Sequence, residues 1–379
     1  MSLRVFVIAG EASGDKLGAA AMAGLRTLTG VEFRGVGGTL MEEQGLESRF
    51  PMSELSLMGI AEILPKYLHL KRRIREVAEA ILDWRPDVVL TIDSPDFCLR
   101  VADLVKARAD IRFCHYVAPT VWAWRPERAA RMAAKVDQVL ALFPFEPPYF
   151  EAVGLRCDFV GHPAVTDEIA DEAAVARFRA DHGIGEAPLV LVLPGSRRGE
   201  IARLGPIFGD TLGRFAGPRP EARYVLPVAP GLDAAVRAEV AGWPVDPVLV
   251  PSADRAGKRA AFRAADLALA ASGTVSLELA ANGTPMVIAY RMNPLTERIV
   301  KRKLLVDTVT LVNLVTETRV VPEFLGADCI PHRIAAALAH ELNAGAAQKA
   351  ALDETMRRLG QGEEPPGVRA ARAILDGLS

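Results

Sequence analysis

The sequence predicts an α/β protein made of two Rossmann-like domains, each built on a parallel sheet. Short apolar runs rich in β-branched residues alternate with helical stretches along the chain, as expected when helices cover both faces of a sheet. The pattern starts a second time near residue 188. A chain of 379 residues is also too long for one compact core.

The predicted strands are the short, nearly continuous apolar segments. They are Leu3–Ala9, Val88–Ile92, Ile111–Tyr116 and Gln138–Phe143 in the first half, and Leu189–Leu193, Arg223–Pro227, Val248–Val250, Leu267–Ala270 and Met286–Ala289 in the second.

We predict an N-terminal domain over residues 1–165, a C-terminal domain over 166–345 and C-terminal helices over 346–379. The last helix, Val368–Leu378, follows the Gly- and Pro-containing segment Gly360–Gly367. We expect these C-terminal helices to pack back toward the first domain. Two such domains facing across a cleft describe the GT-B architecture of nucleotide-sugar enzymes.

Composition excludes several classes of protein. Half of the residues are apolar and 24% are charged, as in soluble globular proteins. The net charge of −2 gives no electrostatic attraction for nucleic acid. The four cysteines have no CxxC spacing and are expected to be reduced thiols of a cytosolic protein. No apolar run is long enough for a signal peptide or a membrane span, so any membrane contact is expected to be peripheral.

The loop Gly10–Asp15 follows the first strand and opens the first helix, where ligands of open α/β sheets bind. Glu11 is expected to face the cleft, while Ser13 and Gly14 lie at a helix start suited to an anion or hydroxyl. On composition alone, a tight turn with Ser13 or Asp15 as N-cap is the favoured alternative. The loop matches neither GxGxxG nor a P-loop, which disfavours a nicotinamide or ATP enzyme.

Asp93 follows another strand, in the segment Thr91–Phe97. A carboxylate there points into the cleft and can accept a proton from a substrate hydroxyl. We predict Asp93 as a general base and Asp96 as a turn residue; the competing interpretation is that Asp93 caps the next helix. The spacing does not match a DxD magnesium site, and no metal site is predicted.

The segment Tyr116–Arg125 contains two of the four tryptophans. Trp122, Trp124 and Arg125 beside a Pro-Thr turn predict a rigid wall of a binding cleft. His162 lies at the domain junction, as a hinge or a substrate contact.

Two loops of the second half suit a diphosphate. In Gly195-Ser196-Arg197, a glycine turn feeds a helix start and carries a guanidinium. Ser272, Gly273 and Thr274 form a similar turn, and Glu278 one helical turn later can reach ribose hydroxyls. An acid early in a helix also stabilises the helix dipole, which would by itself explain Glu278.

A segment from residue 58 to 75 has the composition of an element that contacts acyl chains and anionic headgroups. An ordinary amphipathic helix is the alternative. The apolar residues proposed for the contact are Met58, Ile60, Leu64, Tyr67 and Leu68, and the basic ones are Lys71, Arg72 and Arg73.

Taken in order, these motifs resemble lipid-A-disaccharide synthases over nearly the entire chain. The matching segments are Gly10–Asp15, Gly35–Gly38, Met58–Glu62, Ile92–Phe97, Tyr116–Arg125, Leu142–Glu146, Gly161–Pro163, Leu193–Arg197, Ser272–Glu278 and Pro285–Arg291.

The resemblance implies an inverting, metal-independent GT-B glycosyltransferase without a cofactor. Its expected substrates are UDP-2,3-diacylglucosamine and 2,3-diacylglucosamine 1-phosphate, and its products are the β-1,6-linked lipid A disaccharide 1-phosphate and UDP. It implies Asp93 as base, Arg197 on the phosphate side and Ser272–Glu278 at the UDP site. The family's nucleotide-side asparagine falls on Asn313, although Val312 replaces the usual proline before it.

The resemblance also favours the acyl-contact interpretation of residues 58–75. It implies a cytoplasmic protein peripherally associated with the inner membrane of a Gram-negative cell, and it allows a homodimer. A UDP-sugar 2-epimerase of the same architecture is the alternative function. A non-catalytic binding protein is a third.

Overall fold

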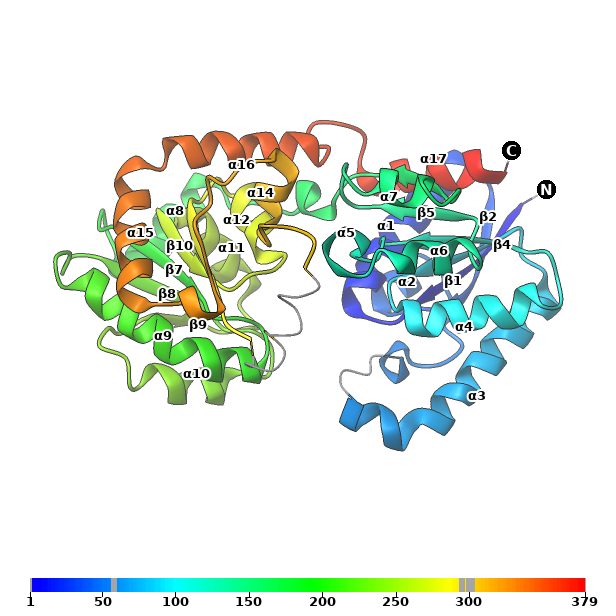
Figure 1. The fold of residues 1–379 in the computed structure, drawn as a ribbon, viewed down its shortest axis with the longest axis horizontal. Helices are drawn as coiled ribbons and strands as arrows, with labels where there is room; N and C mark the ends of the chain where they lie inside the picture. Colours follow the sequence, from blue (N-terminus) through cyan, green and yellow to red (C-terminus); the bar gives the residue numbers. More distant parts are fainter. Residues whose placement is uncertain (1, 56–59, 293–296, 298–303, 379) are drawn as a thin grey trace. The chain divides into compact units, whose positions relative to one another are not determined.

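The computed structural model describes residues 2–55, 60–292, 297 and 304–378, with backbone alone considered for residues 60–67 (Figure 1). The chain divides into two compact units. The first comprises the residues up to Pro163 and those from Gly362 onward, and the second is Ala164–Gln361. The predicted boundary after residue 165 falls beside this one, in the short helix η2 (Pro163–Thr166).

The first unit contains a six-stranded parallel sheet in the order β2-β1-β3-β4-β5-β6. Its strands are β1 (Leu3–Ala9), β2 (Val31–Val36), β3 (Val88–Ile92), β4 (Arg112–Tyr116), β5 (Gln138–Ala141) and β6 (Arg156–Phe159). The sheet grows in opposite directions from β1 and β3, and Ala9 pairs with Ile92, which in turn pairs with Tyr116. The loops after β1, β3 and β4 therefore leave the sheet together, which is where α/β proteins bind ligands.

The second unit repeats this plan in the order β12-β11-β10-β7-β8-β9, again with parallel pairs. Its strands are β7 (Leu189–Leu193), β8 (Arg223–Pro227), β9 (Val248–Val250), β10 (Leu267–Ala270), β11 (Met286–Tyr290) and β12 (Glu323–Leu325). Leu193 pairs with Ala270, so the carboxyl ends of the two central strands are level.

Amphipathic helices bury their apolar faces on the sheets. The first unit has α1 (Ala12–Leu28), α2 (Thr39–Glu43), α3 (Ile60–Trp84), α4 (Pro95–Lys106), α5 (Val121–Trp124), α6 (Glu127–Ala133), α7 (Pro147–Glu151), α17 (Pro366–Leu378) and the 3-10 helix η1 (Met52–Glu54). The second has α8 (Glu172–Asp181), α9 (Arg198–Ala216), α10 (Asp233–Val240), α11 (Arg255–Ala264), α12 (Val275–Ala281), α14 (Leu311–Thr316), α15 (Pro331–Ala344), α16 (Ala346–Arg358) and the 3-10 helix η3 (Gly326–Asp328). In the first unit, α3 and α4 contribute Ile81 and Val101 to a core shared with Phe113 of β4.

The two C-terminal helices belong to different units. Helix α17 packs closely on α1 of the first unit, as Figure 1 shows. Helix α16 packs instead on α12 and α14 of the second unit and buries Leu352 and Met356. The expectation that all residues from 346 onward return to the first domain is therefore wrong for α16, because its apolar face is covered within the second unit.

Glycines allow the close approach of α1 and α17. A Cβ atom on Gly24 would lie 2.5 Å from the carbonyl oxygen of Gly367, and one on Gly367 would lie 2.5 Å from that of Ala20. Both contacts are with backbone, which cannot rotate away as a side chain can. The two helices therefore meet only if both positions lack a side chain.

We expect Gly24→Val to lower the free energy of unfolding by about 1–3 kcal/mol, because the added side chain pushes α17 away from α1. Urea unfolding followed by circular dichroism measures the change. Gly30→Val is the matched control, since a Cβ there meets only Ser2 Oγ at 4.0 Å. Equal midpoints for the two variants would contradict the tight crossing.

Candidate active site

The backbone at the carboxyl ends of β3 and β4 adopts conformations that side chains disfavour. Asp93 and Ser94 have φ values of 52° and 45°, and Val117 has a φ of 80°. Left-handed geometry is unusual for a non-glycine residue and a marked outlier for a β-branched one. Such strain concentrates at functional sites, where the surrounding structure holds it in place.

Asp93 is half-buried at this position. Its N–H donates to the carbonyl of Tyr116 at 3.0 Å, which ties the loop after β3 to the end of β4. Its Oδ1 accepts the N–H of Ser94 at 2.8 Å, and Ser94 is the N-cap residue of α4. Asp93 does not cap α4 itself, so this alternative for its role is not supported.

The loops after β1 and β3 lie in contact, as the sheet order predicts. A Cβ on Gly10 would lie 2.4 Å from Ser94 Oγ, and one on Gly14 would lie 3.5 Å from Ile92 Cγ2. Ser13 is exposed in the first turn of α1, close in sequence to this contact. The structure therefore brings the glycine loop and the loop carrying Asp93 together.

Asp15 has a structural role that differs from the predicted one. Its buried carboxylate accepts N–H groups of Gly38, Leu40 and Met41 at 2.9, 3.0 and 3.1 Å. The residue therefore holds the start of α2. The N-cap of α1 is Glu11, so the interpretation of Ser13 or Asp15 as cap of α1 is wrong.

The two tryptophans after β4 have different environments. Trp122 is only 7% exposed, and its ring meets Phe145 edge-to-face at 5.2 Å between centroids. Trp124 is half-buried, with the Arg125 guanidinium carbon 4.1 Å from its ring centroid. The prediction that both indoles form a cleft wall needs correction for Trp122, which supports the loop from inside.

Glu146 anchors this loop and was not assigned a role from the sequence. Its Oε1 accepts the indole N–H of Trp122 at 3.2 Å, and its Oε2 accepts the N–H groups of Leu142 and Phe143 at 3.1 and 3.0 Å. Glu146 as a whole is 2% exposed. Burial raises its pKa to about 7, although the three N–H donors favour the ionised form.

His162 lies at the end of an aromatic row that begins beside Glu146. Its ring is 5.3 Å from that of Phe143, which stacks on Phe145 at 5.3 Å. His162 is buried within the first unit. A signal for Glu146 was present in the sequence, since this acid directly follows the apolar segment Leu142–Phe145 after the buried strand β5.

Ionisation of Glu146 should make stability depend on pH. Its pKa of about 7 in the folded protein exceeds the ordinary 4.5, so the folded state keeps a proton that the unfolded state releases. The free energy of unfolding should therefore fall between about pH 5 and 7, by at most about 1.4 kcal/mol per pH unit. Urea unfolding of the wild type and of Glu146→Gln at pH 5 and pH 8 isolates this contribution. If the free energies of unfolding of the two proteins differ by the same amount at both pH values, Glu146 is ionised in the folded protein at pH 5 as well as at pH 8.

A cavity of about 740 Å³ lies in the second unit, at the carboxyl ends of β7, β8, β9 and β10. The two predicted phosphate loops form one side of it. Its lining includes Gly195, Ser196, Arg197, Ser272, Gly273, Thr274 and Glu278. The structure therefore brings together the predicted donor-site residues of this half, except Asn313.

Glu200 changes the expected role of the loop after β7. Its Oε2 accepts the N–H groups of Ser196 and Arg197 at 2.9 and 3.2 Å. These N–H groups, which suited a phosphate, are bound by the protein's own carboxylate. The Arg197 side chain is 65% exposed, and its Nη1 lies 3.7 Å from Glu200 Oε1. Arg197 is therefore the charged group of this loop that can meet an anion.

Helix α11 supplies cavity residues that the sequence did not indicate. Arg255, Lys258 and Phe262 all line the cavity. Lys258 Nζ lies 2.7 Å from Glu278 Oε2 and 5.0 Å from the Phe262 ring centroid. Arg255 is exposed and has no carboxylate partner among the described residues. Cationic side chains thus gather on the cavity wall formed by α11.

Asn313 lies elsewhere in the second unit. It is fully buried in α14, where its amide exchanges two hydrogen bonds of 3.0 Å with the backbone of Val321. It is absent from the lining of the cavity. Its polar atoms hold the turn after α14, and the predicted nucleotide contact has no support in this structure.

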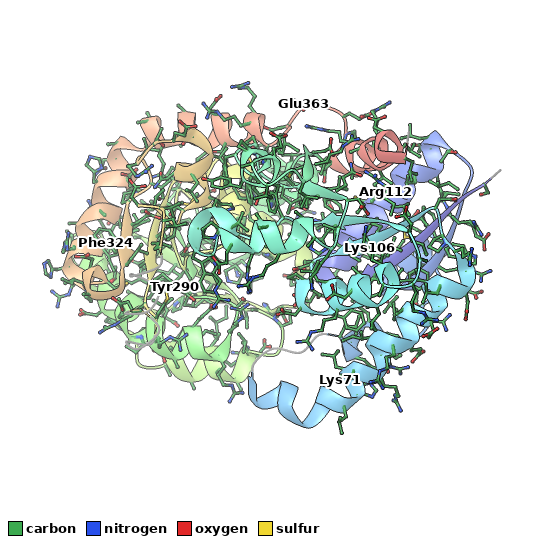
Figure 2. All side chains as sticks on the ribbon, turned by 45° about the vertical axis from the view of Figure 1, so that its right-hand side comes forward. Lys71, Lys106, Arg112, Tyr290, Phe324 and Glu363 are labelled. Carbon is green, nitrogen blue, oxygen red and sulfur yellow. The ribbon has the colours of Figure 1, made fainter. Side chains whose placement is uncertain are left out.

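The predicted acyl-contact segment falls largely on α3. Met58 lies outside the described residues. Ile60, Leu64 and Tyr67 lie in α3, where the structure describes only their backbone. Leu68 is 79% exposed, and Lys71 and Arg72 are exposed. Figure 2 labels Lys71 on this helix. Among the described residues, no helix combines the length and apolar character needed to cross a membrane.

Arg73 does not share this exposure. Its Nε and Nη2 donate to Glu54 at 2.8 and 2.9 Å, and its Nη1 donates to Glu76 at 2.7 Å. Hydrogen bonds from Arg73 and His69 lower the pKa of Glu54 to about 2. Arg73 therefore fixes α3 to η1, and its inclusion among the lipid-facing cations is corrected.

Solved structures of low sequence identity share this fold. A UDP-GlcNAc 2-epimerase from Neisseria meningitidis, bound to UDP-GlcNAc, has a TM-score of 0.64 at 12% identity over 99% of both chains. The glycotransferase of kitacinnamycin has a TM-score of 0.63 at 16% identity over 100% of both chains. These likenesses show the GT-B architecture and nothing about activity.

Sequence relatives are far closer. The lipid-A-disaccharide synthase of Ruegeria pomeroyi is 61% identical, over 99% of this chain and 96% of its own length. That of Rhodospirillum centenum is 49% identical, over 99% of this chain and 94% of its own. The family described as lipid-A-disaccharide synthetase matches residues 5–373. The chain therefore belongs to the lipid-A-disaccharide synthetase family of glycosyltransferases.

Proposed function

We propose that this enzyme transfers diacylglucosamine from UDP-2,3-diacylglucosamine to 2,3-diacylglucosamine 1-phosphate. The products are the β-1,6-linked disaccharide 1-phosphate and UDP. The observation that carries the proposal is the cavity of the second unit, where Arg197, the Ser272–Thr274 turn and Glu278 meet. Guanidinium, hydroxyl and carboxylate groups are the partners that a diphosphate and a ribose require.

In the proposed reaction, Asp93 accepts the proton of the acceptor 6-hydroxyl. The hydroxyl oxygen attacks the anomeric carbon of the donor from the face opposite UDP, which inverts the configuration. The bond between that carbon and the phosphate oxygen breaks, and its electron pair leaves with UDP. Arg197 and the Ser272–Thr274 turn stabilise the charge that develops on the diphosphate, so that no metal is required.

The acyl chains of both substrates require an apolar surface. Helix α3 supports this role through Leu68, beside the exposed cations Lys71 and Arg72. We infer that this part of α3 rests on the cytoplasmic face of the inner membrane, with its cations on anionic headgroups.

Mass spectrometry of a coupling reaction tests the proposal. The two diacylated substrates are incubated with the enzyme in the presence of EDTA. A disaccharide 1-phosphate together with UDP is the expected result. A rearranged single sugar would identify an epimerase instead, and product only without EDTA would overturn metal independence.

A further inference from the structure

Lys258 lines the cavity but is not explained by the reaction as proposed. Its ammonium group lies 2.7 Å from Glu278 Oε2. The side chains of Lys258 and Glu278 are 48% and 38% exposed, so the pair faces solvent in the cavity. An exposed ion pair contributes little to stability, so a substitution of Lys258 should leave the fold intact.

The surroundings hold the lysine in place. Its Nζ lies 5.0 Å from the centroid of Phe262, one turn later on α11, and this ring also lines the cavity. The attraction between an ammonium group and an aromatic face restricts the lysine side chain. The lysine in turn restricts the Glu278 side chain. A ligand that binds Glu278 therefore costs less side-chain entropy than it would with an unrestricted carboxylate.

The ion pair also changes what Glu278 can accept. A carboxylate has about four acceptor sites on its two oxygens, and Lys258 occupies one of them on Oε2. The remaining sites can accept two neighbouring hydroxyl groups. Pairing with Lys258 also offsets the repulsion between Glu278 and a diphosphate bound in the same cavity.

We infer that Lys258 is a positioning residue that holds the Glu278 carboxylate ready for the ribose hydroxyls of a uridine nucleotide. The inference rests on the proposed function, because it takes UDP as the ligand of this cavity. Its signature is selectivity for ribose, which a lysine acting only on the diphosphate would not produce.

Calorimetric titration with UDP and 2′,3′-dideoxy-UDP measures this selectivity without the lipid substrates. The wild type should prefer UDP by roughly tenfold or more, as expected for hydrogen bonds to a charged acceptor. Glu278→Gln should reduce the preference strongly. Lys258→Met should reduce it by roughly threefold or more, and Lys258→Arg should restore most of it.

Arg255→Met is the matched control. It removes a cation from the same helix and cavity, but from a residue that contacts no carboxylate among those described. It should weaken both nucleotides equally. An unchanged preference in Lys258→Met, or an equal loss for both nucleotides, would overturn the positioning role. A wild type that binds neither nucleotide would instead overturn the proposed function, and the inference with it.

Discussion

Asp93→Asn should lower the turnover number by about 10²- to 10⁴-fold while the affinity for UDP stays unchanged. The amide cannot accept the proton of the acceptor hydroxyl. Asparagine keeps the shape of the side chain and tolerates the left-handed backbone found at this position, with φ of 52°. The loss should therefore report chemistry rather than strain. Single-turnover coupling and calorimetric titration with UDP measure the two quantities.

Asp96→Asn is the control for this experiment. Asp96 is exposed in the first turn of α4, three residues beyond Asp93, and its replacement removes the same charge. It should change turnover by less than about threefold, because it lies outside the strained loop. Comparable losses of turnover in both variants would indicate a long-range electrostatic effect and would contradict the role of Asp93 as the general base.

Arg197→Met should lower kcat/KM by about 10²- to 10³-fold, which corresponds to about 2.7–4 kcal/mol of transition-state stabilisation. Arg197 projects from the loop after β7 with 65% of its side chain exposed, and the N–H groups beside it are bound by Glu200. The guanidinium is therefore expected to bind the departing diphosphate, because the N–H groups of Ser196 and Arg197 already donate to Glu200. Steady-state kinetics with both substrates measures the loss.

Arg198→Met provides the comparison for Arg197. Arg198 is exposed, begins α9 and is not part of the cavity lining. Its replacement should leave kcat/KM within about threefold of the wild-type value. If both variants lose kcat/KM equally, the loss arises from the total positive charge at the start of α9, and a specific role of Arg197 is contradicted.

The sequence predicted the central strands well and missed three of the four edge strands, while the fourth, β9, has the predicted bounds. The bounds of β7, β8 and β10 agree with the predicted ones, because strands buried on both faces are continuous apolar runs. Three strands were missed: β2, β6 and β12 lie at sheet edges. There, alternation such as Val31-Glu32-Phe33-Arg34 replaces the apolar run, since one face or edge meets solvent.

The candidate site was predictable where parallel strands bring loops together. The contact of Gly10 with Ser94 follows from the order of β1 and β3 alone. The partners of individual side chains did not follow in the same way. Glu200 bonding to the N–H groups of the Arg197 loop, and Asn313 bonding to Val321, depend on helix rotation that a sequence pattern does not encode.

The return of α17 to α1 has a consequence for the order in which the protein is made. The second unit, Ala164–Gln361, is one continuous stretch of chain, whereas the first unit is interrupted by it. Domains generally fold as units while the ribosome delivers them. The surface of α1 around Gly24 is translated early, yet its partner at Gly367 emerges only after the entire second unit. The unit that is started first is thus completed last, and its helix surface stays uncovered through most of synthesis.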